Sequence, residues 1–146
     1  MAGAQDILIV DDEADIRSLI SGVLEDEGYA PRQAANDQEA FAAVALRRPD
    51  LIILDIWLKN SRLDGLGILE KIIADHPHLP ILMISGHGTI ETAVQAIKRG
   101  AYDFIEKPFK TDRLIHMVER AIEAARLRRE NRDLRQRAEV GLDVIG

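Results

Sequence analysis

Residues 51–55 read Leu-Ile-Ile-Leu-Asp, a run of four apolar side chains that ends in a carboxylate. A second apolar run, from Ile7 to Val10, ends in the same way at Asp11 and Asp12. Continuous apolar runs of this length are typical of strands in the middle of a parallel sheet, because helices cover both faces of such a sheet. The two stretches therefore predict central strands that carry acids at their carboxyl ends.

Outward from these runs, short apolar stretches alternate with amphipathic ones, five times in all, which is the pattern of a parallel sheet wrapped by helices. The predicted strands are Asp6–Val10, Ala30–Ala34, Leu51–Leu54, Ile81–Ser85 and Asp103–Glu106. The predicted helices are Ala14–Glu27, Asp37–Arg47, one that Asp64 and Gly65 open, Ile90–Arg99, and a long one from Asp112 to about Arg137. We expect an α/β fold: a flavodoxin-like (βα)5 doubly wound parallel sheet of order 2-1-3-4-5 with an extended C-terminal helix.

One residue bears directly on that strand order. Pro31 lies in the second predicted strand and has no N–H to donate to a strand ladder, which confines it to the edge of a sheet. In the order 2-1-3-4-5 the second strand is an edge strand. The proline therefore agrees with the predicted topology.

The composition fits one globular domain with an appendage. The 146 residues are 47% hydrophobic and 30% charged, enough for a sizeable core. The longest apolar runs are far shorter than the roughly 20 residues that span a bilayer. No basic residue precedes the first run, which argues against a signal peptide, and the lack of cysteine excludes disulfides. We expect a cytoplasmic protein with no membrane segment.

Charge divides the chain into two segments. The net charge of −6 argues against general nucleic-acid binding, yet six arginines crowd into residues 126–137, against Glu130 and Asp133. The same segment has a stripe at alternating spacings of four and three, made of Leu127, Asn131, Leu134 and Ala138. This stripe suits either a short coiled coil or a solvated helix with a frayed end.

Polar side chains interrupt the predicted strands at one end of the sheet. They are Asp11 and Asp12 after the first strand, Asp55 after the third, Ser85 at the end of the fourth and Lys107 after the fifth. Taken singly, each has an ordinary explanation as a helix cap, a turn residue or a surface charge, and Asp12 is a candidate cap for the first helix. Ligands, however, bind outside the carboxyl ends of parallel strands, where the strand order reverses. The five residues together predict a binding site there.

The three carboxylates determine the chemistry we expect. Like charges within a few ångströms raise one another's pKa unless a cation compensates, and a set of oxygen ligands favours Mg²⁺ over zinc or copper. Asp55 is then the nucleophile toward a phosphoryl donor and forms an acyl phosphate. Lys107 offsets charge on the phosphoryl oxygens, and Ser85 donates a hydrogen bond to one of them.

A family resemblance rests on three stretches: residues 7–13, LIILDIWL at 51–58, and MISGHGTIETAVQAIKRGAYDFIEKPF at 83–109. They resemble the receiver domain of the NtrC class of response regulators, and most closely NtrX-type nitrogen-regulation regulators, over roughly residues 4–126. The resemblance implies a two-component receiver that takes a phosphoryl group on Asp55 from a sensor histidine kinase. It also implies a phosphoacceptor rather than an enzyme, one that controls a downstream transcription-activating module.

The resemblance further implies a metal site. Asp12, Asp55 and the backbone carbonyl of Trp57 would bind Mg²⁺, and Asp11 would reach the ion through water. The family has a short loop with a proline after the acceptor, whereas residues 56–63 are longer and contain none. Trp57 either packs on this loop or, together with His87, shields the acyl phosphate from water.

By the same resemblance, Ser85 and Phe104 form the switch pair, and the Lys107–Pro108 bond is cis. A homodimer is implied through the face of the fourth helix, fifth strand and fifth helix, together with the linker helix. We expect residues 4–126 to be the receiver and residues 127–146 to be a helical linker toward an ATPase and DNA-binding portion.

Two other functions remain open on the residues alone. An aspartate-nucleophile phosphatase of the haloacid dehalogenase type needs a second aspartate two residues after its nucleophile, where this chain has Trp57. A pseudo-receiver that only binds partners would lack the acceptor or the lysine, and both are present. The chain has no phosphate-binding Gly-rich loop and no helix-turn-helix pattern, so we expect no ATP hydrolysis and no DNA binding from it.

Overall fold

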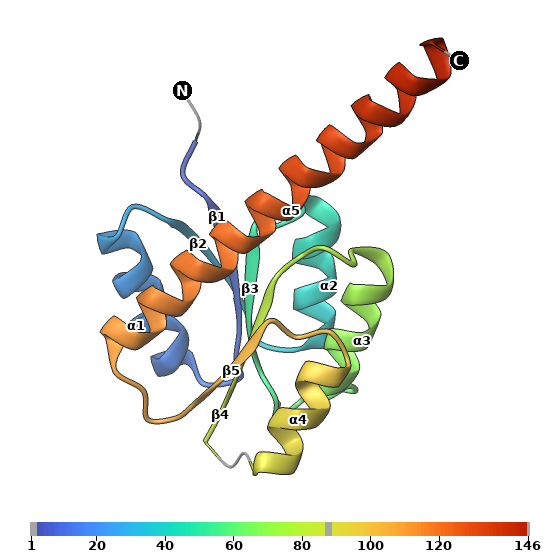
Figure 1. The fold of residues 1–146 in the computed structure, drawn as a ribbon. Coiled ribbons are helices and arrows are strands. Elements are labelled where there is room, and N and C mark those ends of the chain that lie inside the picture. The colour runs from blue at the N-terminus through green and yellow to red at the C-terminus, as the bar shows by residue number, and fades with distance from the viewer. Residues whose placement is uncertain (1–2, 87–88, 146) are drawn as a thin grey trace.

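A computed structural model describes the backbone of residues 3–86 and 89–145 and the side chains of residues 3–86 and 89–135. Its strands are β1 (Asp6–Val10), β2 (Ala30–Ala34), β3 (Leu51–Asp55), β4 (Ile81–Ser85) and β5 (Asp103–Glu106). Its helices are α1 (Ala14–Asp26), α2 (Asp37–Leu46), α3 (Gly65–Asp75), α4 (Ile90–Lys98) and α5 (Thr111–Ile145). All strand pairings are parallel, in the order β2-β1-β3-β4-β5 (Figure 1). The predicted fold and strand order are confirmed.

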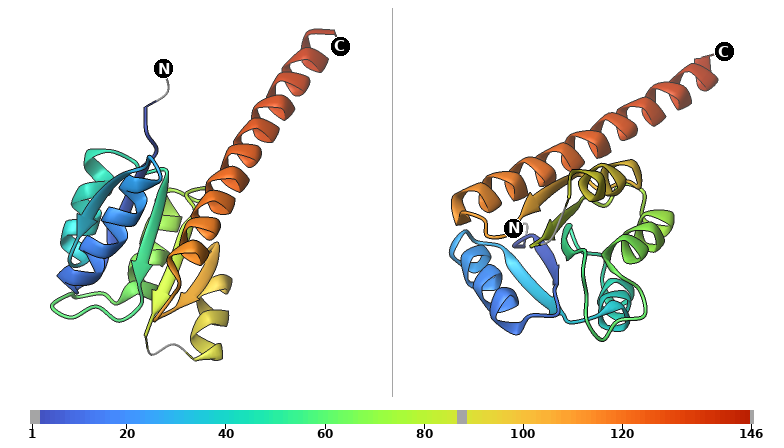
Figure 2. Two further views of the ribbon diagram at one scale, coloured as in Figure 1. Left: turned by 90° about the vertical axis from the view of Figure 1, so that its left-hand side faces the viewer. Right: turned by 90° about the horizontal axis from the view of Figure 1, so that it is seen from below.

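Helices cover both faces of this sheet, with α1 and α5 on one face and α2, α3 and α4 on the other (Figure 2). Alternate residues of β1 therefore enter two different cores. Ile7 and Ile9 pack with α1 and α5, while Leu8 and Val10 pack on the opposite side, and all four are 0% exposed. Burial on both faces is the reason that the central strands are continuously apolar.

Pro31 lies on the edge strand β2, opposite Ile7 of β1. Strand β2 is the first strand of the sheet and pairs with β1 alone, so a residue without an N–H is tolerated there. The expectation that the proline marks an edge is confirmed.

Short side chains start three of the helices. Asn36, Asp64 and Thr89 occupy N-cap positions, and each side chain accepts a hydrogen bond from the backbone N–H three residues on, at 2.9, 2.9 and 3.2 Å. The N-cap of α1 is Glu13, without a side-chain hydrogen bond. Capping of α1 by Asp12, the ordinary explanation for that residue, is therefore wrong.

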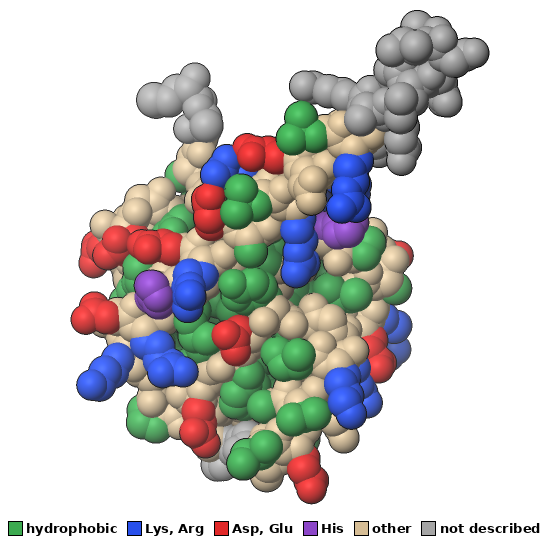
Figure 3. Space-filling model, viewed as in Figure 1, with side chains coloured by type: hydrophobic (Ala, Val, Ile, Leu, Met, Phe, Trp, Pro, Cys, Tyr) green, Lys and Arg blue, Asp and Glu red, His purple; other side chains and the backbone are tan. Residues whose placement is uncertain are grey.

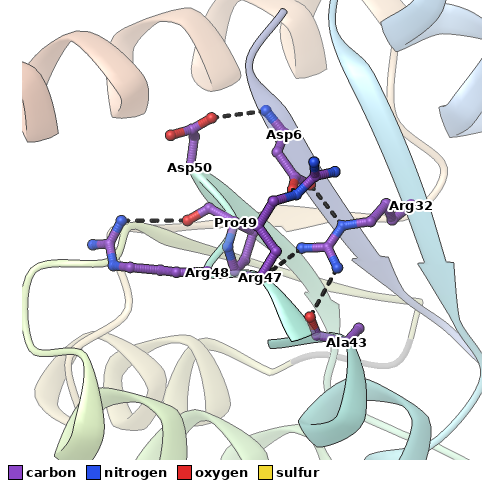
Figure 4. A network of polar contacts seen from close by, with 7 residues as sticks. All are labelled: Asp6, Arg32, Ala43, Arg47, Arg48, Pro49 and Asp50. Atoms are coloured by element: carbon purple, nitrogen blue, oxygen red, sulfur yellow. Dashed lines mark hydrogen bonds and ion pairs between the residues drawn. The ribbon is translucent and has the colours of Figure 1, made fainter. Parts of the chain in front are cut away.

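Ion pairs anchor the loop between α2 and β3, at the amino-terminal edge of the sheet (Figure 4). Asp6 is 7% exposed, and its two carboxylate oxygens accept from Arg32 Nε and Arg47 Nε, each at 2.8 Å. The backbone N–H of Asp6 donates to Asp50 Oδ2 at 2.8 Å. This network ties both ends of residues 47–50 to β1 and β2.

Helix α5 projects well beyond the domain (Figures 1 and 2). Its 35 residues run to Ile145, past the predicted end near Arg137, and the helical backbone is continuous across the predicted boundary between residues 126 and 127. The side chains of residues 136–146, the end of the predicted linker, lie outside the described side chains. Within the described part of the chain, no helix is both long and apolar enough to cross a bilayer.

Candidate functional site

The sheet brings the predicted polar residues to one edge. Asp55 ends β3, Ser85 ends β4, Asp11 follows β1 directly and Lys107 follows β5 directly. Asp11 and Ser85 are 0% exposed and Asp55 is 4% exposed. Lys107 Nζ lies 2.9 Å from Asp11 Oδ2 and 3.3 Å from Asp55 Oδ2, so one ammonium group bridges carboxylates from the ends of two neighbouring strands.

The carboxylate of Asp55 is held in an unfavourable electrostatic environment. Burial, and after it the negative charge of Asp11, raise the pKa of Asp55 to about 6, although Lys107 and a hydrogen bond from the Trp57 backbone oppose this. Burial would lower the pKa of Lys107, but its contacts with Asp11 and Asp55 outweigh burial and raise it. Near pH 7 the site therefore contains a charged lysine and a carboxylate that is mostly ionised.

Backbone contacts fix the positions of the acids that surround Asp55. The Glu13 N–H donates to Asp11 Oδ1 at 2.9 Å, and Arg17 Nη1 donates to the Asp11 carbonyl at 2.7 Å. The backbone N–H of Lys59 donates to Asp12 Oδ2 at 3.3 Å. The loop after β3 is thus tied to the end of β1, and the sequence pattern had pointed to neither Arg17 nor Lys59.

The geometry suits a hard metal ion. Carboxylate oxygens of Asp11, Asp12 and Asp55 all lie within 4.8 Å of one another. Asp12 and Asp55 line a cavity of about 270 Å³ that Trp57 and Lys107 also line, and Asp11 lies buried behind them. Three carboxylates against one lysine leave a surplus of negative charge, and an all-oxygen donor set with room for water fits Mg²⁺.

The loop from Ile56 to Asp64 has no proline but is fixed at both ends. The Gly65 N–H donates to the Ile56 carbonyl at 2.7 Å, which places the start of α3 directly under the end of β3. Trp57 on this loop is 49% exposed. His87, the other residue considered as a shield, lies outside the described residues.

The candidate switch residues lie on the neighbouring strands β4 and β5, Ser85 at the end of β4 and Phe104 within β5. The Lys107 N–H donates to the Ser85 carbonyl at 2.8 Å, and the Lys107–Pro108 bond is cis. Phe104 is half-buried and packs against the core on the α2, α3 and α4 face, opposite Met83 of β4. Ser85 therefore borders the edge of the sheet that Asp55 occupies, and Phe104 lies one residue further from that edge than the level of Asp55.

A fold of this order with an acidic crevice at its carboxyl edge can be compared with known proteins. Residues 7–119 match the family model described as "Response regulator receiver domain". The chain belongs to the response regulator receiver domain family. Receiver domains are the phosphoacceptors of two-component systems. The match is therefore consistent with the predicted acceptor and metal chemistry, and it disfavours the phosphatase alternative.

The chain is similar to receivers of NtrX-type regulators. This receiver is 64% identical to the nitrogen assimilation regulatory protein NtrX of Azorhizobium caulinodans over 133 residues, which are 91% of this chain and 29% of that protein. It is 63% identical to the receiver domain of NtrX from Brucella abortus, with a TM-score of 0.79, covering 81% of this chain and 98% of that one. The predicted NtrC-class, NtrX-like identity is confirmed.

A more distant likeness concerns assembly. The beryllofluoride-activated NtrC4 receiver domain, solved as a dimer, is 38% identical to this receiver, with a TM-score of 0.77, covering 82% of this chain and 98% of that one.

The C4-dicarboxylate transport regulator DctD of Rhizobium meliloti is 42% identical over 149 residues. The receiver spans 29% of the length of the Azorhizobium NtrX and 32% of the length of this DctD.

Proposed function

We propose that Asp55 accepts a phosphoryl group from the phosphohistidine of a sensor kinase. A carboxylate oxygen of Asp55 forms a bond to phosphorus while the phosphorus–nitrogen bond of the donor breaks, and the donor histidine keeps the electron pair and takes up a proton. The observation that carries this proposal is the position of Asp55: an ionisable carboxylate at the crevice, beside Lys107 and two further acids. The receiver is then a phosphoacceptor that assists its own phosphorylation.

The residues around Asp55 fit a bound Mg²⁺. Asp12, Asp55 and the Trp57 carbonyl would hold the ion directly, and Asp11 would hold it through water. When bound, the ion supplies positive charge beside the phosphoryl oxygens. Asp11 is 0% exposed and already accepts from Glu13 and Lys107, which suits a residue that orients rather than one that binds directly.

Two further residues act on the phosphoryl group after transfer. The Lys107 ammonium lies 3.3 Å from Asp55 Oδ2. It is therefore close enough to offset the negative charge on an oxygen of a phosphoryl group attached to Asp55. The Ser85 hydroxyl donates a hydrogen bond to a second oxygen, and its movement opens space into which Phe104 turns. The switch thus converts a charge change at the crevice into a change on the surface that α4 and β5 form.

That surface is suited to pairing with a second copy. Ile90, Val94 and Ile97 of α4 are 85%, 45% and 46% exposed, and their spacing places them on one helical face. Exposed apolar side chains grouped in this way mark interaction surfaces. We place the homodimer contact of the phosphorylated receiver at the α4, β5 and α5 face.

The projecting part of α5 adds a second contact. Leu127 and Leu134 are 52% and 62% exposed and occupy equivalent heptad positions, with Asn131 between them. In a parallel pair, Glu130 would face Arg135 of a second copy, an attractive flanking pair. Residues 127–146 then act as a helical linker that passes the dimer state of receiver 4–126 to a downstream transcription-activating module.

The decisive experiment is phosphorylation by a small donor. Incubation of the chain with acetyl phosphate and Mg²⁺ is expected to add the mass of one phosphoryl group, and EDTA or Asp55→Asn is expected to abolish the gain. Asp15→Asn, an exposed acid in the first turn of α1, is the matched control and should be phosphorylated normally. No mass gain in the wild type would overturn the proposal.

A further inference from the structure

A basic cleft lies at the opposite edge of the sheet from Asp55. It has a volume of about 620 Å³ and is formed where α5 leaves the domain, against the loops that precede β3 and β4. Five arginines line it: Arg48, Arg128, Arg129, Arg132 and Arg135. In Figure 3, blue side chains, the colour of Lys and Arg, and a purple histidine lie beneath α5.

The charge of the cleft arginines is not neutralised by nearby acids. On the other side of α5, Arg126 pairs with both Glu123 and Glu130, and in the α2–β3 loop Arg47 pairs with Asp6. Among the side chains that the structure describes, none of the five cleft arginines forms an ion pair. Asp75 also lines the cleft, and Asp50, which accepts from the Asp6 N–H, interacts electrostatically with Arg48.

Arg48 is the cleft arginine that interacts with two of the others, Arg129 and Arg132. Arg48 is exposed to solvent on one side, and partial desolvation on the other, together with the positive charges of Arg129 and Arg132, lowers the pKa of its guanidinium; Asp50 only partly compensates. Its one described hydrogen bond is a long one, from Nη1 to the Pro49 carbonyl at 3.4 Å (Figure 4). A bound anion would remove the repulsion among these three guanidinium groups.

The cleft is also held in shape. Arg48 stands between Arg47 and Asp50, both of which the Asp6 network fixes, and Pro49 is buried. His76 and His78 line the cleft from the α3–β4 loop, where Leu79 N–H donates to the His76 carbonyl at 3.1 Å. The domain side of the cleft is therefore pre-organised, and only the α5 side depends on the direction of the helix.

We propose that this cleft binds a multiply charged phosphate group, the chemistry shared by inorganic polyphosphate and the phosphate chain of a nucleotide. The planar guanidinium forks of Arg48, Arg129 and Arg132 match phosphate oxygens in pairs. No tyrosine, phenylalanine or tryptophan lines the cleft in the described part of the chain, so the phosphates and not a base carry recognition. Because Arg48 belongs to the domain and the other two belong to α5, the ligand fastens the projecting helix to the domain.

Titration calorimetry of the full chain with tripolyphosphate tests the proposal, in EDTA so that no metal ion recruits phosphate to Asp55. Arg48→Gln and Arg132→Gln are each expected to weaken binding by about tenfold or more, the loss expected for one charge-assisted contact. Arg126→Gln is the matched control, an arginine of α5 that faces Glu123 and Glu130, and should change affinity less than about twofold. Bound tripolyphosphate should also slow amide hydrogen exchange in residues 126–135.

Each other outcome has a definite meaning. Binding of ATP as tight as that of tripolyphosphate identifies the phosphate chain of a nucleotide as a source, and binding of tripolyphosphate that ATP does not match identifies polyphosphate. Tighter binding of ATP than of tripolyphosphate would show recognition of the base and contradict the proposal. Equal losses of tripolyphosphate affinity in Arg126→Gln and Arg132→Gln would show that binding depends only on general charge attraction, and would overturn the proposed site. Tighter binding of a glutamate-rich peptide than of either phosphate ligand, or no binding of tripolyphosphate to the wild type, would also overturn it.

Discussion

Gly65 lies against the backbone of Asp55 so closely that a Cβ atom at Gly65 would stand 2.2 Å from the Asp55 carbonyl oxygen and 2.6 Å from the Ile56 Cα. Cβ atoms do not approach backbone atoms at such distances, so any other residue at position 65 would displace either α3 or the end of β3. The proposed phosphoacceptor is thus held in place by the absence of a side chain ten residues later.

Gly65→Ala is therefore expected to damage both stability and phosphorylation. Overpacking against backbone costs about 1–3 kcal/mol, and the displaced Asp55 should be phosphorylated by acetyl phosphate at least about tenfold more slowly. Denaturant unfolding and intact-mass time courses measure the two effects. Gly22→Ala is the control, because a Cβ there meets nothing within 4 Å and Gly22 lies within α1; it should stabilise the receiver by up to about 1 kcal/mol.

The raised pKa of Asp55 predicts a pH dependence of stability without Mg²⁺. In the folded state the pKa of the Asp55 carboxyl is about 6, whereas in the unfolded state it is near 4. Between these two pH values the carboxyl is therefore protonated in the folded state and ionised in the unfolded state. Its contribution is fully present below pH 4 and is lost as the pH rises through 6. Wild type should therefore lose roughly 2–3 kcal/mol of stability relative to Asp55→Asn between those pH values. Parallel stability curves for the two proteins in EDTA would contradict this.

The acidic cluster predicts that Mg²⁺ raises the melting temperature of the wild type. An ion that binds only the folded state stabilises it by RT ln(1 + [L]/Kd), about 2.7 kcal/mol at a hundred times Kd. Asp12→Asn should remove most of this gain, because Asp12 supplies one of the three carboxylates. Asp64 lines the same cavity, and Asp64→Asn keeps the side-chain oxygen that caps α3. The response of this variant to Mg²⁺ should therefore match that of the wild type. Thermal melts over a Mg²⁺ series check this.

Much of this architecture was predictable because local patterns encode it. Apolar runs at 7–10 and 51–54 give the central strands, Pro31 gives the edge, and Asn36 and Thr89 give helix starts. The convergence of the site residues follows from topology alone, because carboxyl ends of parallel strands meet at one edge.

What the sequence did not reveal depends on contacts between distant segments. The approach of Gly65 to Asp55 looked like an ordinary helix start, and the pairing of Asp6 with Arg32 and Arg47 links charges that have no common periodicity. The arginines after residue 125 read as one basic segment, whereas the structure separates Arg126, which is paired, from the cleft arginines. Side-chain direction around a helix decides that difference, and it is fixed only when α5 packs on the sheet.

The Asp6 network predicts unequal effects of its two arginines. Arg32 is 20% exposed, bonds Asp6, and also donates to the Ala43 and Arg47 carbonyls, whereas the Arg47 side chain is 67% exposed. Arg32→Gln leaves a buried carboxylate poorly paired and should cost about 2–4 kcal/mol. Arg47→Gln removes a mostly solvated partner and should cost less than about 1 kcal/mol. Urea unfolding of both variants measures the difference, and equal losses would refute the assigned roles.

Trp57 predicts how long the phosphorylated state lasts. The side chain lines the cavity in front of Asp55, and an apolar ring there excludes the water that would hydrolyse an acyl phosphate. Trp57→Ala should therefore shorten the lifetime of phosphorylated Asp55 several-fold, while Trp57→Phe, which keeps an aromatic ring, should retain most of it. The backbone carbonyl proposed as a Mg²⁺ ligand is present in both variants, so phosphorylation itself should persist. Phosphate loss followed by intact mass after removal of acetyl phosphate gives both rates, and equal lifetimes in wild type and Trp57→Ala would mean that the ring only packs on its own loop.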